Sequence, residues 1–293
     1  MGTLFIGILL LMKAAQGYFN KKASVLLGSR HQFLSFSLFN YAACAALSLL
    51  YLLAAPAGQA PGTGALAVSV LGGLSMAVCS ISGLAALRSG TVALGSLAAA
   101  AGLLIPCAAG PLLFGEHLSP WQGGGVLMLL GAAWLLGGCS KKQYGHLSAK
   151  TVGILLVSLL SNGTTMLAQK LFSFYYPQTS TGVFSLTAFL FASAALLLCV
   201  LPQGRKAGMG SLRLDRPLWI YGLILAGALF VVNLLSTIAS APVPSVVLFT
   251  LVNGGGMLLA AGIGAVFFRE RLTAKSLAGV ALGAMALIII NTL

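Results

Sequence analysis

Acidic side chains are almost absent from this chain, which contains 3 Asp and Glu residues against 16 Lys and Arg residues. Charged residues make up only 6% of the sequence and hydrophobic residues 59%, and the mean hydropathy is +1.02. A chain of this composition cannot bury its apolar side chains in one water-soluble core. The sequence therefore predicts a membrane protein with several spans, whose basic loops meet anionic lipid headgroups rather than nucleic acid.

Motifs of enzymes and metal sites are also missing. The five cysteines stand singly at positions 44, 79, 107, 139 and 199, and the three histidines show no ligand spacing. These patterns indicate neither a zinc site nor a disulfide framework. The chain has no phosphate-binding loop or nucleophile elbow, and three acids supply little for acid–base catalysis. We expect no enzymatic activity, no metal and no cofactor.

Apolar runs of the length that a membrane span requires occur ten times, since about 20 residues of helix cross a hydrocarbon core of about 30 Å. They lie at about 3–20, 32–54, 64–88, 91–114, 119–138, 150–174, 181–201, 217–240, 243–267 and 273–292. Prolines such as Pro56, Pro177 and Pro202 fall between the runs, where helices are expected to end. The predicted fold class is an all-α integral membrane protein with ten transmembrane helices.

The segment 114–138 returns in altered form as 268–292. At an offset of 154 positions, Phe114, Glu116, Leu118 and Gly125 correspond to Phe268, Glu270, Leu272 and Gly279. We interpret the chain as two five-helix repeats, residues 1–140 and 150–293, joined by a linker at 141–149. Because five is odd, the second repeat enters the membrane from the opposite side, so the repeats are inverted and are expected to enclose a central cavity.

A family resemblance rests on three features together. The doubled Phe-x-Glu-x-Leu hairpin, the turn Ala86-Leu87-Arg88-Ser89-Gly90-Thr91 and the five-plus-five plan resemble the ten-helix EamA-type members of the drug/metabolite transporter superfamily. The resemblance covers essentially the whole chain. It implies export or exchange of small metabolites, such as amino acids, sugars, nucleosides or their phosphates, and we expect a bacterial inner (plasma) membrane. Two features depart from the family: the second repeat has Ala241-Pro242-Val243-Pro244-Ser245 in place of the Arg88 turn, and the first helix lacks Trp-Gly.

Lys13 is the sharpest candidate for a binding residue, because a charged side chain within a span is costly and is usually functional. A rise of about 1.5 Å per residue places it about 15 Å into a helix that begins near Thr3, close to the bilayer midplane. Three interpretations stay open. Lys13 is a counter-ion for a substrate carboxylate or phosphate, a proton-coupling group, or a lysine whose long stem reaches toward an interface.

Amide and hydroxyl side chains recur at matching places in the two repeats. Gln16 and Gly17 correspond to Asn162 and Gly163, and Cys79 corresponds to Asn233. Such side chains either bind a ligand or hold helices together through hydrogen bonds. The predicted substrate-binding set is Lys13, Gln16, Asn20, Asn40, Cys79, Asn162, Thr165, Asn233 and Asn253.

Glu116 and Glu270 stand at the hairpin turns, beside His117 and Arg271. We assign them, with Arg88, to the structural motif, and we expect each glutamate to cap the next helix and to pair locally. No acid is predicted at mid-membrane. A proton-coupled exporter of organic cations is therefore disfavoured, and an anionic, zwitterionic or neutral polar cargo fits better.

Basic residues predict the orientation. One set of loops holds Lys21, Lys22, Arg30, Arg88, Lys141, Lys142, Lys150, Arg205, Lys206, Arg213, Arg216, Arg269, Arg271 and Lys275, and the opposite set offers only Lys170. The rich side is expected to be cytoplasmic, which places both termini outside, whereas relatives in the family generally have both termini inside.

These observations predict a secondary transporter or facilitator of a small polar metabolite that is amino-acid-, nucleoside- or sugar-like. It would work by alternating access, with membrane lipid around it and a proton as a candidate coupling ion. A flippase of a lipid-linked headgroup is an alternative, and it would need a polar lateral opening toward lipid. A non-transporting membrane interaction subunit is a second alternative, and it would keep no water-filled cavity.

Overall fold

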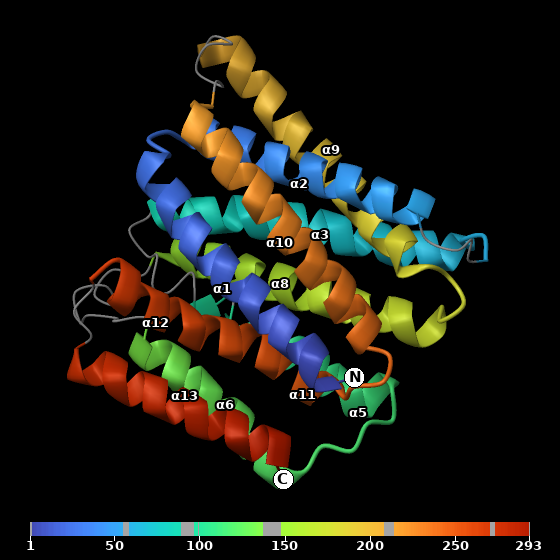
Figure 1. Ribbon diagram of the computed structural model, residues 1–293, viewed down its shortest axis with the longest axis vertical. Helices are drawn as coiled ribbons and strands as arrows, with labels where there is room; N and C mark the ends of the chain where they lie inside the picture. The colour runs from blue at the N-terminus through green and yellow to red at the C-terminus, as the bar shows by residue number, and fades with distance from the viewer. Residues whose placement is uncertain are drawn as a thin grey trace.

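A computed structural model of the chain describes residues 2–54, 59–88, 97–98, 100–136, 148–207, 214–269 and 273–292. The described part is built from helices packed in one bundle, without strands (Figure 1). The helices are α1 (Gly2–Leu26), α2 (Arg30–Ala54), α3 (Thr63–Arg88), α5 (Leu104–Leu113), α6 (Pro120–Leu136), α8 (Ala149–Tyr175), α9 (Thr181–Ala207), α10 (Arg216–Ala239), α11 (Ser245–Thr250), η2 (Leu251–Gly255), α12 (Gly256–Phe267) and α13 (Ala274–Thr292).

Seven helical segments within these ranges are long and apolar enough to cross a membrane. They are Arg30–Ala54, Thr63–Ala85, Ala149–Tyr175, Thr181–Pro202, Arg216–Ala239, Ser245–Phe267 and Ala274–Thr292. The outside of the bundle is apolar, with Leu53 76% and Leu198 72% exposed, while polar Asn233 is only 3% exposed. Leucine outside and amide inside is the arrangement that a hydrocarbon surrounding favours. The chain is a multi-pass integral membrane protein, and the number of ten spans stays a prediction.

Two of the predicted spans are irregular midway. In the run 91–114, α5 covers only the last part and follows a turn at Gly102 and Leu103, and residues 89–96 lie outside the described ranges. In the run 243–267, the π-helical segment η2 separates α11 from α12. A π segment is a local irregularity that occurs often at functional sites. Gly102 and Gly256, at the two irregularities, lie 154 positions apart.

Helices from the first half of the chain pack mainly on helices from the second half. Helix α1 packs on α10 and α12, α2 packs on α9, α3 packs on α8 and α9, and α6 packs on α13 (Figure 1). The two sequence halves are therefore interleaved in space, and a surface shared by both runs through the middle of the bundle.

Glycines bring α6 and α13 into close contact. A Cβ on Gly125 would lie 2.6 Å from Cγ1 of Ile290, and a Cβ on Gly279 would lie 3.1 Å from Cγ of Leu136. The glycines lie 154 positions apart, and so do Leu136 and Ile290. The same glycine contact is thus made in each direction, and it requires the absence of a side chain at both glycines.

Candidate functional site

The inner cavity lies between α1, α2, α3, α8, α10 and the α11–η2 segment and has a volume of about 170 Å³. Its polar walls come from both halves of the chain. Of the predicted binding residues, Lys13, Cys79, Asn162, Thr165, Asn233 and Asn253 line it. Residues more than 200 positions apart in the sequence therefore face one space.

Lys13 reaches this cavity over a glycine of the neighbouring helix. A Cβ on Gly256 would lie 3.4 Å from Cδ of Lys13, so the lysine stem packs directly on this glycine. Among the described residues, the recorded ion pair joins Glu116 and Lys170 and does not involve Lys13. No carboxylate from the described ranges lines the cavity beside Lys13. An ammonium in such a place favours an anionic ligand, because an unpaired charge away from water is costly.

Three other cavity residues are held by their own helices or neighbours. The side-chain oxygen of Asn233 accepts a hydrogen bond from Ser185 at 3.0 Å. The hydroxyl of Thr165 donates to the carbonyl of Ser161 at 3.0 Å. The amide nitrogen of Asn253, within η2, donates to the carbonyl of Phe249 at 3.0 Å. These bonds fix the side chains in place before any ligand binds.

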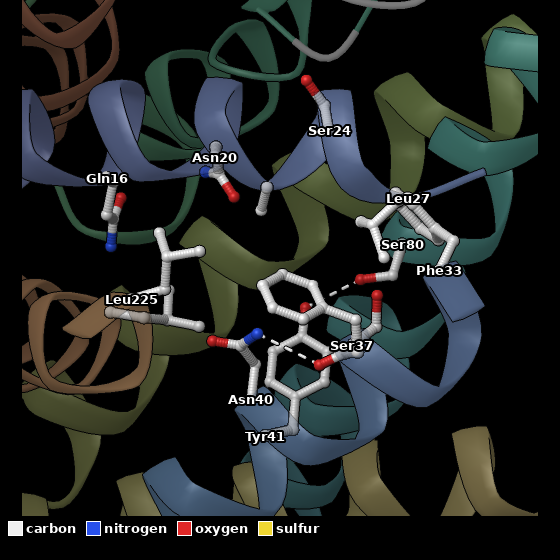
Figure 2. Close-up of a pocket in the computed structure, with 13 residues that line it drawn as sticks. Gln16, Asn20, Ser24, Leu27, Phe33, Ser37, Asn40, Tyr41, Ser80 and Leu225 are labelled. Carbon is white, nitrogen blue, oxygen red and sulfur yellow. Dashed lines mark hydrogen bonds between the residues drawn. The ribbon is translucent and has the colours of Figure 1, made fainter. Parts of the chain in front are cut away.

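An outer cavity of about 280 Å³ adjoins the inner one, between α1, α2, α3 and α10. Gln16, Asn20 and Asn40 line this second space (Figure 2). Tyr41 and Leu229 line both cavities. The prediction of one cavity is therefore refined to two, with the predicted binding residues divided between them.

Tyr41 stands at the boundary between the two cavities. Its hydroxyl is hydrogen-bonded to the hydroxyl of Ser80 at 2.9 Å and donates to the carbonyl of Met76 at 3.4 Å. These bonds tie α2 to α3 across the path from the outer to the inner cavity. A change in the packing of α2 on α3 would alter the opening between them.

A buried ion pair lies at the opposite end of the inner cavity. The ammonium of Lys170 lies 2.6 Å from a carboxylate oxygen of Glu116. Their side chains are 3% and 14% exposed. The same ammonium donates to the carbonyls of Ser240 at 2.7 Å and Val243 at 3.1 Å. The neighbour of Lys170, Gln169, lines the inner cavity, so the pair lies next to the cavity wall.

Glu116 also holds the start of the segment that begins with α11. Its carboxylate accepts hydrogen bonds from the backbone nitrogen of Ser245 at 2.8 Å and from its hydroxyl at 3.2 Å. Lys170 binds carbonyls at the end of α10, so the two charges complement the helix dipoles on either side of the link 241–244.

Three expectations about charged residues need correction. Glu116 was predicted to pair locally, beside His117, and to cap the next helix. It pairs instead with Lys170 and caps α11, because the fold brings the α5–α6 link against the start of α11. Lys170 was assigned to a loop, but it lies within α8 and is 2% exposed. The predicted run 150–174 already contained Lys170, and its place inside a span was the signal for a buried partner.

Two structural-motif residues lie beyond what the structure describes: Glu270, and the side chain of Arg88 at the end of α3. The structure adds wall residues that the predicted binding set omits, namely Tyr41, Gln169 and Ser236. The hydroxyl of Ser236 is buried and has no hydrogen-bond partner among the described residues. Its position one turn after Asn233 on α10 was the signal for it.

Comparison with known proteins yields structural relatives only. No family model matches the chain, and no curated protein matches it. Among solved structures 28 chains match. One crystal structure of a protein superposes with a TM-score of 0.75 at 19% identity and covers 98% of this chain and 95% of its own. The likeness establishes the fold. It spans nearly the full length of both chains.

Proposed function

We propose that the protein is a secondary transporter or facilitator of a small polar metabolite that carries an anionic or zwitterionic group. The observation that carries the proposal is Lys13: its ammonium enters a cavity walled by amides and hydroxyls from both halves of the chain, with no described carboxylate beside it. A cavity of this kind hydrogen-bonds a polar cargo and neutralises its negative charge.

The arrangement of helix pairs supports two inverted repeats. Matched in order, α1, α2, α3 and α6 of the first half correspond to α8, α9, α10 and α13 of the second. The pair α1–α10 then corresponds to the pair α8–α3, and the two helices of each pair pack against each other. Exchange of the two halves turns the pair α6–α13 into the same pair, and its glycine contacts are reciprocal. The irregular segments at Gly102 and η2 also correspond. Discontinuous helices near the midplane of an inverted repeat are typical of secondary transporters. This supports membership in the EamA-type group of the drug/metabolite transporter superfamily.

The two ends of the path differ in this structure. Asn20 and Ser24, which line the outer cavity, are exposed near the α1–α2 connection. The opposite end carries the Glu116–Lys170 pair. Alternating access would require that pair to separate when the far end opens, while the outer cavity closes around Tyr41. Lys21, Lys22 and Arg30 lie at the open end, near the α1–α2 connection, and we propose that this end is cytoplasmic, in a bacterial inner membrane.

The two alternative functions have less support. A flippase would need polar residues in a groove that faces lipid. The groove of about 320 Å³ between α1 and the α10–α11 region is lined by apolar described residues such as Phe5, Leu9 and Val243. An interaction subunit would not need two adjoining polar cavities.

Ligand-induced thermal stabilisation tests the proposal, because a ligand that binds only the folded state raises its melting temperature. The purified protein is melted with amino acids, sugars, nucleosides, phosphorylated metabolites and organic cations. We expect stabilisation by an anionic or zwitterionic class, and its loss in Lys13→Met. The matched control, Lys150→Met, removes an exposed lysine at the start of α8 and should respond as the wild type does. Stabilisation by organic cations alone, or an unchanged response in Lys13→Met, would contradict the proposal.

A further inference from the structure

We propose that the outer cavity is a second recognition site, separate from the Lys13 cavity, for an uncharged group with an amide-like edge, such as the edge of a nucleobase. The role of this site in selecting cargo rests on the proposed transport function, but its binding does not. The site is defined by Gln16 on α1 and Asn40 on α2, which face the cavity across its width (Figure 2).

Both amides carry a buried polar atom without a hydrogen-bond partner. The side-chain nitrogen of Gln16 and the side-chain oxygen of Asn40 have no partner among the described residues. The residues are 9% and 8% exposed. The nitrogen of Asn40 donates to the carbonyl of Phe36 at 3.0 Å, which fixes the amide orientation and leaves its oxygen turned to the cavity. Figure 2 shows the free atoms of both residues directed toward the space beside Leu225.

Unpartnered amides of this kind are not interhelical glue. Residues that hold α1 to α2 would bond to each other or to the opposite backbone, and these two do not. A buried polar atom without a partner costs stability, so its retention calls for a ligand that completes it. The free nitrogen donates and the free oxygen accepts, so the complementary ligand carries both an acceptor and a donor, as an amide-like edge does.

The walls of the outer cavity narrow the chemical class of the ligand further. Phe33, Phe36 and Tyr41 contribute aromatic rings, which favour a flat partner. None of the described residues that line the cavity carries a charge. The volume of about 280 Å³ lies at the lower end for ligand pockets, which suits a single ring. A pyrimidine lactam such as uracil meets all of these conditions, since it is flat, uncharged and carries C=O next to N–H.

Thermal melting with two matched probes tests the proposal. Uracil presents the C=O and N–H edge, whereas 1,3-dimethyluracil keeps the ring and both carbonyls but has no N–H. We expect uracil to raise the melting temperature by about 3 °C at ten times its Kd, and the dimethyl compound to have no effect. No response to uracil up to its solubility limit, or an equal response to both compounds, would overturn the proposal.

Three variants separate a binding role from a structural one. Gln16→Met and Asn40→Leu remove the unpaired atoms at similar volume. We expect each to abolish the uracil response and to melt at or above the wild-type temperature without ligand. Ser35→Ala is the control, because the Ser35 hydroxyl is also unpartnered but does not line the cavity; it should keep the response. Variants that melt lower without ligand and still respond to uracil would assign the amides a structural role instead.

Lys13→Met separates this inference from the proposed function. In the same experiment it should lose the response to the anionic metabolites and keep the response to uracil, because Lys13 lines the inner cavity and not the outer one. If the wild type responds to uracil but to no anionic metabolite, the transport proposal is contradicted and the outer site is supported. If the wild type responds to anionic metabolites but not to uracil, the outer site is contradicted and the transport proposal is supported.

Discussion

Removal of either member of the Glu116–Lys170 pair should destabilise the protein strongly, because each leaves the other as an uncompensated buried charge. Such changes lower the free energy of unfolding by about 3–5 kcal/mol. Glu116→Gln leaves the nearly buried Lys170 ammonium with neutral partners, the carbonyls of Ser240 and Val243 and the ring of Phe114, so we expect the upper part of that range. Lys170→Met leaves Glu116, which is 14% exposed and keeps its two bonds from Ser245, so we expect the lower part.

The double variant Glu116→Gln/Lys170→Met distinguishes an ion pair from two independent contributions. Because neither charge remains, the double variant should lose less free energy of unfolding than the sum of the losses of the two single variants. The difference, which is the coupling energy of the pair, should be about 2 kcal/mol. Loss of helical circular dichroism on heating in detergent measures the effect. At about 2 °C per kcal/mol for a large domain, the single variants should melt about 6–10 °C lower. Lys150→Met should change the free energy of unfolding by less than about 0.5 kcal/mol. Additive losses in the double variant would refute the reasoning.

Three further predictions concern packing and orientation. Gly163→Ala should lower the free energy of unfolding by about 1–3 kcal/mol, since its Cβ would overlap the carbonyl oxygen of Gly102. Gly227→Ala is the control: a Cβ there has nothing within 4 Å, so the change should stabilise α10 slightly, and denaturation of both variants checks this. Gly256→Leu should displace the Lys13 side chain and remove the response to anionic ligands, whereas Gly262→Leu, also on α12 and with no atom within 4 Å, should keep it. A C-terminal reporter should show a non-cytoplasmic location, because Lys170, which alone opposed the charge asymmetry, is paired; a cytoplasmic signal would contradict this.

Hydropathy alone predicts the helical class and points to part of the polar interior. In a membrane the cost of a polar side chain is high, so Lys13, Asn162 and Asn233 stand out against an apolar background and do face an inner space. The same logic applied to Gln16 and Asn40, although their cavity proved to be a separate one.

The arrangement around Glu116 could not be predicted from local sequence. Its partner Lys170 lies 54 positions away and its capped residue Ser245 lies 129 positions away, so only the folded chain brings them together. The π segment was also invisible, because one widened helical turn changes neither composition nor hydropathy. The division of the interior at Tyr41 depends on a hydrogen bond between two helices, which no periodicity encodes.

The central claim is that cargo crosses the membrane through the Lys13 cavity. Counterflow in proteoliposomes tests it most directly. Vesicles loaded with an unlabelled metabolite are diluted into a solution of the same compound in labelled form, and uptake of the label is followed. Each class of metabolite that stabilised the purified protein is tested in this way. The account predicts transient accumulation of an anionic or zwitterionic compound with the wild type and with Lys150→Met, and at least a tenfold slower uptake with Lys13→Met, as expected for the loss of about 1.4 kcal/mol or more of binding. Accumulation at the wild-type rate with Lys13→Met, or only of organic cations, would contradict it.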